Sequence, residues 1–243
     1  MQQLEWNSLL LEKWLQSQGV FLKRGDIIQT RILLVRNDYD PITHYMYEWS
    51  VPVMNAAEKR GIKVDRVDGQ RVIKKEIVSR IEKLKPGFIF LNGHGDSKTF
   101  YGYDNEVAIG ITDANIFKNK IVFTRVCNCV KKLGKKAVEK HSCTSFIGYE
   151  FEFVNVRQTN VELKLREDEI SRPIWEVSNT VPISLIKGTT VTEAVESSHK
   201  KATKEISRLL FSKELGSISV LKAILTNDEG LKYHGDGSAK FFY

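Results

Sequence analysis

The sequence has no long apolar run and little cysteine, and both absences limit what the protein can be. Nowhere in its 243 residues does an apolar stretch approach the roughly 18 residues that a membrane-spanning helix needs. The first residues also lack the basic and apolar regions of a secretory signal peptide. Three cysteines, an odd number in a chain of this length, argue against a disulfide framework and for a reducing compartment. We therefore expect a cytoplasmic protein with no membrane partner.

A concentrated block of positive charge is also missing, although the net charge is +7. The 37 basic residues are spread along several amphipathic segments, and neither aromatic-interleaved RNA-binding patterns nor zinc-finger spacings occur. We expect no specific nucleic-acid partner. Association with nucleic acid through the net charge alone stays open as an alternative, and such binding would weaken steeply with salt.

Strand and helix patterns alternate between residues 31 and 150. Apolar runs bounded by Gly or Pro predict strands, and apolar residues at helical spacing predict helices between them. Strands are predicted at 31–35, 62–67 and 144–149, with two more that run into His94 and Cys127; helices are predicted at 44–60, 72–85 and a lysine-rich stretch to about 140; a hairpin is predicted at 99–111 and a short helix at 112–117. This alternation predicts an α/β fold with a mostly parallel central sheet and helices on both faces.

The two ends of the chain differ from this central part. Residues 1–30 contain an amphipathic pattern and are interpreted as an N-terminal helical extension. Residues 31–150 form the predicted core of the domain. Residues 151–243 begin with a polar, mixed stretch, continue with a helical pattern at 192–213 and end in a glycine-rich segment. They are interpreted as the C-terminal part of the same domain or as a small regulatory lobe.

Two of the apolar runs end in reactive side chains. One ends in Gly93-His94-Gly95 and the other in Val126-Cys127-Asn128-Cys129. In open α/β sheets the binding crevice lies at the carboxyl ends of the strands, so neighbouring strands would bring His94 and Cys127 to the same cleft. A thiol and an imidazole placed in this way are the minimal equipment for nucleophilic thiol chemistry.

With these motifs, the chain resembles the caspase-like cysteine peptidases, the clan of caspases, gingipains, separases and CHAT-domain proteins. The resemblance covers about residues 31–150 and is strongest to bacterial CHAT and gingipain-like members. It implies a three-layer caspase-like fold and a cysteine endopeptidase that needs no cofactor. It also implies that His94 and Cys127 form the catalytic dyad, with the backbone N–H groups of Gly95 and Cys127 as the oxyanion hole.

The same resemblance implies protein partners. The substrate would be a protein, and a regulatory protein or complex would activate an otherwise latent protease, in bacterial defence or cell death. A non-catalytic caspase-like adaptor that uses the fold as a binding platform is the alternative, and thiol reactivity at Cys127 would separate the two.

The state of the thiol can also be predicted from its neighbours. Cys127 would lie near the N-terminus of the following helix, and Lys131 and Lys132 lie one turn further on. Helix dipoles and cations favour a thiolate. No third carboxylate that would orient His94 is obvious, and Asp96 is the nearest candidate in sequence.

The sequence leaves the substrate pocket undecided. Arg125 shares a strand face with Cys127 because side chains alternate along a strand. The loop after the first strand carries Arg36, Asp38 and Asp40, and in relatives this loop contributes to the same pocket. Arginines would favour an acidic substrate side chain and aspartates a basic one.

Two alternatives concern the cysteines themselves. Cys129 occupies a position where the clan usually has a smaller residue, so it competes with Cys127 as the attacking thiol; we favour Cys127, which ends the strand directly. The spacing C-x-C-x11-H-x-C at Cys127, Cys129, His141 and Cys143 would also suit a zinc site. Structural zinc knuckles usually lie on loops with a wider first spacing, so we expect no metal.

Overall fold

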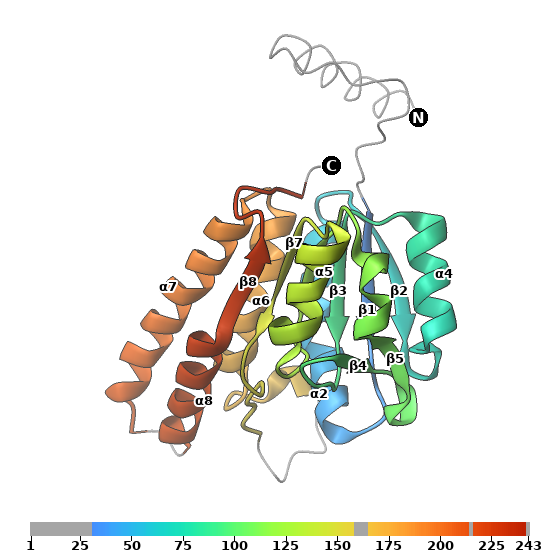
Figure 1. Ribbon diagram of the computed structural model, residues 1–243. Helices are drawn as coiled ribbons and strands as arrows, with labels where there is room; N and C mark the ends of the chain where they lie inside the picture. Colours follow the sequence, from blue (N-terminus) through green and yellow to red (C-terminus); the bar gives the residue numbers. More distant parts are fainter. Residues whose placement is uncertain (1–30, 158–164, 214–215, 242–243) are drawn as a thin grey trace.

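The computed structural model describes residues 31–157, 165–213 and 216–241 of the chain (Figure 1). The helical extension predicted for residues 1–30 lies outside the described residues. None of the described helices is long and apolar enough to cross a membrane.

A six-stranded sheet forms the centre of the fold, with the strand order β2-β1-β3-β6-β7-β8. The strands are β1 (Arg31–Arg36), β2 (Lys63–Asp68), β3 (Phe88–Asn92), β6 (Ile121–Thr124), β7 (Ser145–Tyr149) and β8 (Leu231–Gly235). All neighbouring strands pair in parallel except β8, which is antiparallel to β7. The predicted α/β class with a mostly parallel sheet is therefore confirmed.

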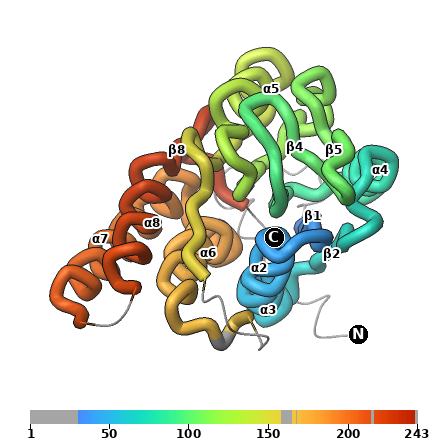
Figure 2. Tube along the Cα trace, turned by 90° about the horizontal axis from the view of Figure 1, so that it is seen from below, coloured from blue at the N-terminus to red at the C-terminus, as the bar shows by residue number. Residues whose placement is uncertain are grey.

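Helices cover both faces of this sheet, which makes three layers (Figure 2). One face is covered by α2 (Pro41–Trp49), α3 (Val51–Glu58), α6 (Arg172–Ile186), α7 (Val191–Leu210) and α8 (Ser217–Gly230). The other face is covered by α4 (Lys74–Leu84), the 3-10 helix η3 (Ile111–Phe117), the π-helix η4 (Val130–Gly134) and α5 (Lys135–His141). Alternate strand residues enter opposite layers, so Phe88 and Phe90 pack on the first face while Ile89 and Leu91 pack on the second. Burial on both faces explains why these strands are continuous apolar runs.

The single helix predicted at 44–60 is wrong in detail, because two helices occupy this region. The break falls at Ser50, whose hydroxyl donates to the Tyr47 carbonyl at 2.6 Å. Pro52 follows in the first turn of α3 and has no N–H to continue the hydrogen-bond ladder of α2. The first helix also begins earlier than predicted, at Pro41, because Asp40 caps it with its side chain.

The segment between the two candidate catalytic residues forms the predicted hairpin, with β4 (Thr99–Tyr101) antiparallel to β5 (Val107–Gly110). Asp104 and Asn105 both have positive φ, as expected for residues at the turn. Asn37, at the end of β1, binds this hairpin and β3 together. Its backbone N–H donates to the Asn92 carbonyl at 3.0 Å, and its side-chain amide donates to the Gly102 carbonyl at 2.7 Å.

The part of the chain after residue 150 packs on the same sheet. Strand β8 extends the sheet beyond β7, and α6, α7 and α8 share one apolar layer with α2 and α3. Helix α7 corresponds to the helix predicted at 192–213. Neither α6 nor α8 was predicted, because α6 carries buried polar residues such as Ser178 and Asn179 that obscure its apolar face.

Candidate active site

The two candidate catalytic residues lie at equivalent places on neighbouring strands. Strands β3 and β6 pair in parallel with Leu91 opposite Thr124, and His94 and Cys127 each come three residues beyond that pair. The Arg125 N–H donates to the Leu91 carbonyl at 3.0 Å, which continues the pairing past the end of β6. Both side chains therefore lie at the carboxyl edge of the sheet, where parallel α/β folds bind their ligands.

The loops that carry the two residues touch each other. A Cβ atom on Gly95 would lie 2.2 Å from the Val126 side chain and 2.2 Å from the Thr99 carbonyl oxygen, so glycine is required for this close approach. A second link joins the loop after His94 to the helix after Cys127, because the Leu133 N–H donates to the Ser97 carbonyl at 2.9 Å. The loops that carry His94 and Cys127 are thus held together by a close packing contact and by a backbone hydrogen bond.

The imidazole of His94 is paired with a carboxylate. Its Nε2 lies 2.8 Å from Asp40 Oδ2, and the ring meets Tyr39 edge-on at 6.2 Å between centroids. Asp40 also accepts the N–H groups of Ile42 and Thr43 as the cap of α2. Burial would raise the pKa of the Asp40 carboxyl, but the hydrogen bond from Thr43 and the neighbouring His94 outweigh it and lower this pKa.

This pairing corrects two interpretations of the sequence. Asp40, predicted to line the substrate pocket, instead orients the imidazole. Asp96, the nearest carboxylate in sequence, instead closes its own loop, where it accepts the Lys98 N–H at 2.7 Å and the Tyr101 hydroxyl at 2.8 Å. The partner of His94 thus comes from 54 residues away in the chain.

The thiol of Cys127 is half-buried and is covered by the segment that follows β7. The Phe153 N–H donates to Cys127 Sγ at 3.4 Å, and the Asn128 N–H donates to the Phe151 carbonyl at 3.2 Å. Further along, the Asn227 amide on α8 binds both the N–H and the carbonyl of Val154, each at 2.8 Å. We call residues 150–157 the strap. Among the described residues, the partner of the thiol is the strap and the partner of the imidazole is Asp40, so no hydrogen bond joins thiol and imidazole.

The thiol is also less acidic than the sequence suggested. Burial raises the pKa of Cys127, the Phe153 N–H opposes the rise, and the Glu152 carboxylate adds to it. The surroundings of Cys127 in this structure therefore do not favour the predicted thiolate. Helix η4 begins only at Val130, and Lys131 is turned toward the Asn128 side chain and the Phe151 ring.

The other two cysteines are poor nucleophiles and do not form a metal site. Cys129 is fully buried in the layer opposite to Cys127, and burial raises its pKa. Burial also raises the pKa of Cys143 to about 12. Within the described ranges, which contain Cys127, Cys129, His141 and Cys143, no group of three or more such side chains is placed to hold a metal ion. The zinc interpretation therefore finds no support.

Two backbone donors lie beside the site. Within the described part of the chain, the Gly95 N–H donates to no acceptor, and the Cys127 N–H is directed at the Cys127 thiol itself. These are the two donors that the family resemblance implies for an oxyanion hole.

The predicted substrate pocket does not come together as expected. Arg36 is buried and forms a two-bond ion pair with Asp68, at 2.8 Å and 2.6 Å, and Asp38 pairs with His44 at 2.8 Å. Together with Asp40, three of the four predicted pocket residues are therefore engaged with other parts of the protein. The fourth, Arg125, is fully buried and contacts Trp175 in the apolar layer against which Cys127 also packs.

Sequence reasoning missed the residues that surround Arg125. They are Phe90, Trp175, Ser178 and Asn179, of which the last three come from α6, and Phe153 of the strap packs on Trp175. The signal that could have revealed α6 is the pair Ser178-Asn179 inside an otherwise apolar stretch, since buried polar residues are usually kept for a specific partner.

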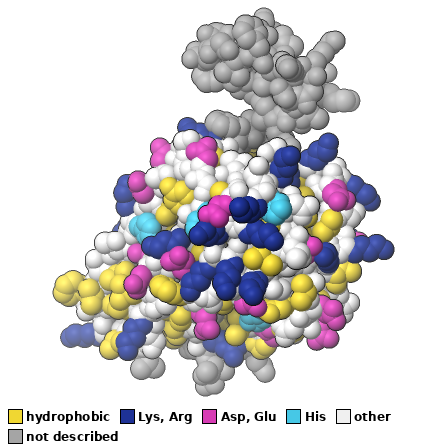
Figure 3. Space-filling view, in the orientation of Figure 1, with side chains coloured by type: hydrophobic (Ala, Val, Ile, Leu, Met, Phe, Trp, Pro, Cys, Tyr) yellow, Lys and Arg dark blue, Asp and Glu magenta, His cyan; other side chains and the backbone are white. Residues whose placement is uncertain are grey.

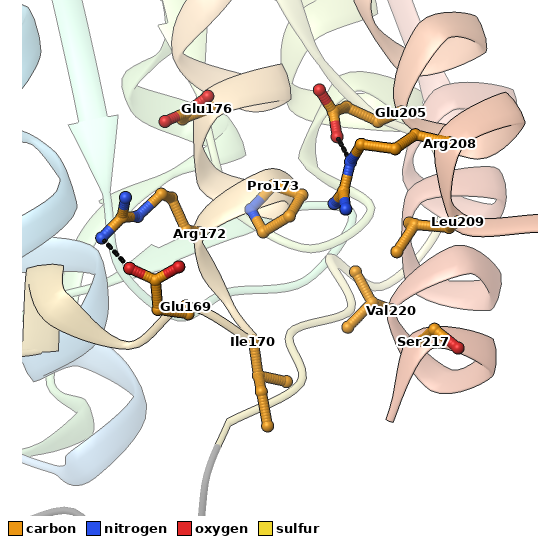
Figure 4. A pocket seen from close by; sticks show the side chains of 10 residues that line it. All are labelled: Glu169, Ile170, Arg172, Pro173, Glu176, Glu205, Arg208, Leu209, Ser217 and Val220. Atoms are coloured by element: carbon orange, nitrogen blue, oxygen red, sulfur yellow. Dashed lines mark hydrogen bonds and ion pairs between the residues drawn. The ribbon is translucent and has the colours of Figure 1, made fainter. Parts of the chain in front are cut away.

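A separate hollow of about 380 Å³ lies between α6, α7 and α8 (Figure 4). Charged side chains on its wall form the ion pairs Arg172–Glu169 and Arg208–Glu205, each at 2.9 Å. Neither His94 nor Cys127 lines it. The surface in Figure 3 mixes basic and acidic side chains, in line with the spread of lysines along the sequence.

Comparisons with known proteins identify the fold. No family model and no curated protein matches the sequence. Among solved structures, the chain is similar to the Arg-specific cysteine proteinase gingipain R, with a TM-score of 0.54, 10% identity and coverage of 89% of this chain and 48% of the other. It is also similar to the complex of the pro- and mature domains of RgpB from Porphyromonas gingivalis, with a TM-score of 0.58, 11% identity and coverage of 88% and 49%. The chain thus spans about half the length of these proteins, and the likeness shows that its fold is caspase-like.

Proposed function

We propose that this protein is a cysteine peptidase with Cys127 as nucleophile and His94 as general acid and base. The observation that carries the proposal is the placement of both side chains at equivalent positions on adjacent parallel strands, with His94 oriented by Asp40. A nucleophile, a base and a group that orients the base are the parts that thiol hydrolysis requires. The caspase-like fold of known cysteine proteinases supports the same reaction class.

The chemistry follows from the positions of the donors. Asp40 occupies Nε2 of His94, which leaves Nδ1 to accept the proton of the Cys127 thiol. The thiolate then attacks the substrate carbonyl carbon, and the negative oxygen is bound by the N–H groups of Gly95 and Cys127, which the family resemblance implies as donors. His94 donates its proton to the leaving amine, and the C–N bond breaks to give a thioester. His94 next takes a proton from water, which hydrolyses the thioester and frees Cys127.

The resting state described here corresponds to a latent enzyme. The strap lies on the thiol, and burial raises the pKa of Cys127, which disfavours the thiolate. Activation by a protein partner, which the resemblance to CHAT and gingipain-like proteins implies, would act by moving the strap. A role in bacterial defence or cell death rests on that resemblance and is part of the proposal.

The test is cleavage of a peptide library with varied residues before the scissile bond. Wild type is compared with Cys127→Ala, His94→Ala and Cys129→Ala. We expect cleavage to be lost in the first two variants and kept in the third, because Cys129 is buried in the other layer. Cleavage that persists in Cys127→Ala would contradict the proposal.

A non-catalytic adaptor is the second candidate, and the lack of a hydrogen bond between His94 and the thiol favours it. Labelling with an acyloxymethyl ketone probe distinguishes the two. A latent peptidase is labelled at Cys127 in a manner that depends on His94. An adaptor is labelled no faster than a denatured control, and equally in His94→Ala.

A further inference from the structure

Arg125 is a buried cation without a carboxylate partner among the described residues. Its exposed fraction is 0%. Its Nε donates to the Ser178 hydroxyl at 2.8 Å, one terminal nitrogen donates to the Asn179 side-chain oxygen, and the other terminal nitrogen, Nη1, has no hydrogen-bond partner. Both partners are neutral, so the positive charge is not balanced locally.

The surroundings of Arg125 are also short of hydrogen-bond acceptors. The guanidinium lies over the rings of Phe90 and Trp175, at 5.0 Å and 5.3 Å from their centroids, which compensates part of the buried charge. The indole N–H groups of Trp175 and of Trp49, which stacks on it, are buried and have no acceptor. A buried donor without an acceptor is costly, and native proteins rarely keep several together without a function.

We propose that Arg125 binds an acidic side chain, that of Asp or Glu, in the peptide residue whose carbonyl carbon lies at Cys127. The inference rests on the proposed function, since Cys127 defines where the peptide lies. Arg125 comes two residues before Cys127, and both pack against the same apolar layer. A carboxylate accepts two N–H bonds from a guanidinium in a planar pair, which would satisfy Nη1 and balance the charge.

The strap controls access to this position. The Phe153 ring packs on Trp175 at 5.4 Å and on Tyr149 at 4.9 Å between centroids, while its N–H covers the thiol. Trp175 is therefore shared by Phe153 and Arg125. A peptide that reaches Cys127 must displace the strap, and the space that Phe153 leaves beside Trp175 gives its side chain a route to Arg125.

The inferred preference is opposite in sign to that of the structural neighbour. Gingipain R is described as Arg-specific. In this chain a basic side chain at the same place would meet the buried cation of Arg125 and be repelled, so the shared fold does not carry the neighbour's preference.

The experiment uses the Cys127→Ala chain, which binds peptides without cutting them. Fluorescence anisotropy measures the affinity for matched peptides that have Asp, Asn or Arg at one central position. The peptides are tested on two backgrounds, the single variant Cys127→Ala and the double variant Cys127→Ala with Asn227→Ala. The second substitution frees the strap. We expect Asp to bind at least about tenfold more tightly than Asn, and Arg more weakly than either. Adding Arg125→Gln should abolish the difference between Asp and Asn, while Arg125→Lys should keep part of it. Thermal unfolding of each variant confirms that it is folded.

Two results would overturn the inference: equal binding of the Asp and Asn peptides (or binding of neither) in both backgrounds, or a preference for Asp that survives Arg125→Gln. Cleavage of the same peptides by Asn227→Ala, in which Cys127 is intact and the strap is freed, keeps this test separate from that of the proposed function. Binding that prefers Asp without cleavage by Asn227→Ala would contradict the peptidase but uphold the role of Arg125. Cleavage by Asn227→Ala at equal rates after Asp and Asn would support the peptidase but contradict the role of Arg125.

Discussion

The carboxyl ends of β1 and β6 each carry a buried arginine, and their surroundings are opposite. At the end of β1, Arg36 is paired with Asp68 and lies over the Tyr47 ring at 3.9 Å. At the end of β6, Arg125 has only neutral partners and one unsatisfied nitrogen. The charge of the first arginine is balanced within the protein, whereas that of the second is not. Two residues of the same type, equally buried, thus differ in the way expected if Arg36 has a structural role and Arg125 has the binding role proposed for it.

The largest effect is expected when Arg36 loses its carboxylate partner and so becomes an unbalanced buried cation like Arg125. Asp68→Ala would leave the buried Arg36 without a carboxylate and should lower the free energy of unfolding by about 3 kcal/mol, because an uncompensated buried charge is costly. Urea denaturation measures the change. The control is Glu139→Ala, which removes the exposed pair with Lys135 and should cost less than about 0.5 kcal/mol. A loss below about 1 kcal/mol in Asp68→Ala would show that Arg36 does not depend on its partner.

A second substitution tests the pairing between the β1 loop and His94. Asp40→Asn keeps the helix cap, since Asn is as good a capping residue as Asp. It removes the charge beside the imidazole, so we expect kcat/KM to fall about 100-fold while the fold is retained. Peptide cleavage measures the effect, and Asp96→Asn, whose carboxylate faces its own loop, is the matched control. Unchanged kcat/KM in Asp40→Asn would exclude a positioning role for Asp40.

The lowered pKa of Asp40 gives this pair a defined pH dependence. The contribution of the Asp40 carboxylate to stability is complete above the pKa of an unfolded aspartate, about 4. This contribution is lost as the pH falls through the lower pKa that Asp40 has in the folded state. Acid unfolding of Asp40→Asn should lack this contribution. Identical acid unfolding of wild type and Asp40→Asn would contradict the assignment.

Releasing the strap tests whether it protects the Cys127 thiol beyond the end of β6. Asn227→Ala removes two hydrogen bonds to Val154, each worth about 1 kcal/mol, so the strap should open more often and Cys127 should be alkylated by iodoacetamide about tenfold faster. Because only the thiolate reacts and the pKa of Cys127 is raised, the rate in wild type should still be rising above pH 8.5, the ordinary pKa of cysteine. Cys129 and Cys143 are internal controls that stay unlabelled. An unchanged rate at Cys127 would mean that the strap does not protect it.

The smallest expected effect is on the stability of the Arg125 site itself. Arg125→Met removes two hydrogen bonds to neutral groups but also an unbalanced buried charge, so unfolding should change by less than about 1 kcal/mol. Urea denaturation beside Asp68→Ala gives the comparison directly. A loss as large as that of Asp68→Ala would make Arg125 a structural residue like Arg36.

The sequence allowed the strands to be predicted better than the partners of the site. Strands β3 and β6 are apolar on both faces and end in Gly and polar residues, so their position and their juxtaposition followed from pattern and from the rules of parallel sheets. The pairs Asp40–His94 and Arg36–Asp68 join residues 54 and 32 positions apart, and no local pattern encodes such contacts. The burial of Cys127 depends on the strap, whose path is set by α8 at the other end of the chain.

Asn37 has a practical consequence for anyone who wishes to redesign this protein. Its single amide group and backbone N–H tie β1 to both β3 and the hairpin, and the next residues lead to the carboxylate that holds His94. Grafting a foreign loop at 37–40 would therefore misalign the imidazole. The strap carries none of these ties to the histidine, so libraries that vary residues 150–157 could change which peptides are accepted while leaving the reactive groups in register.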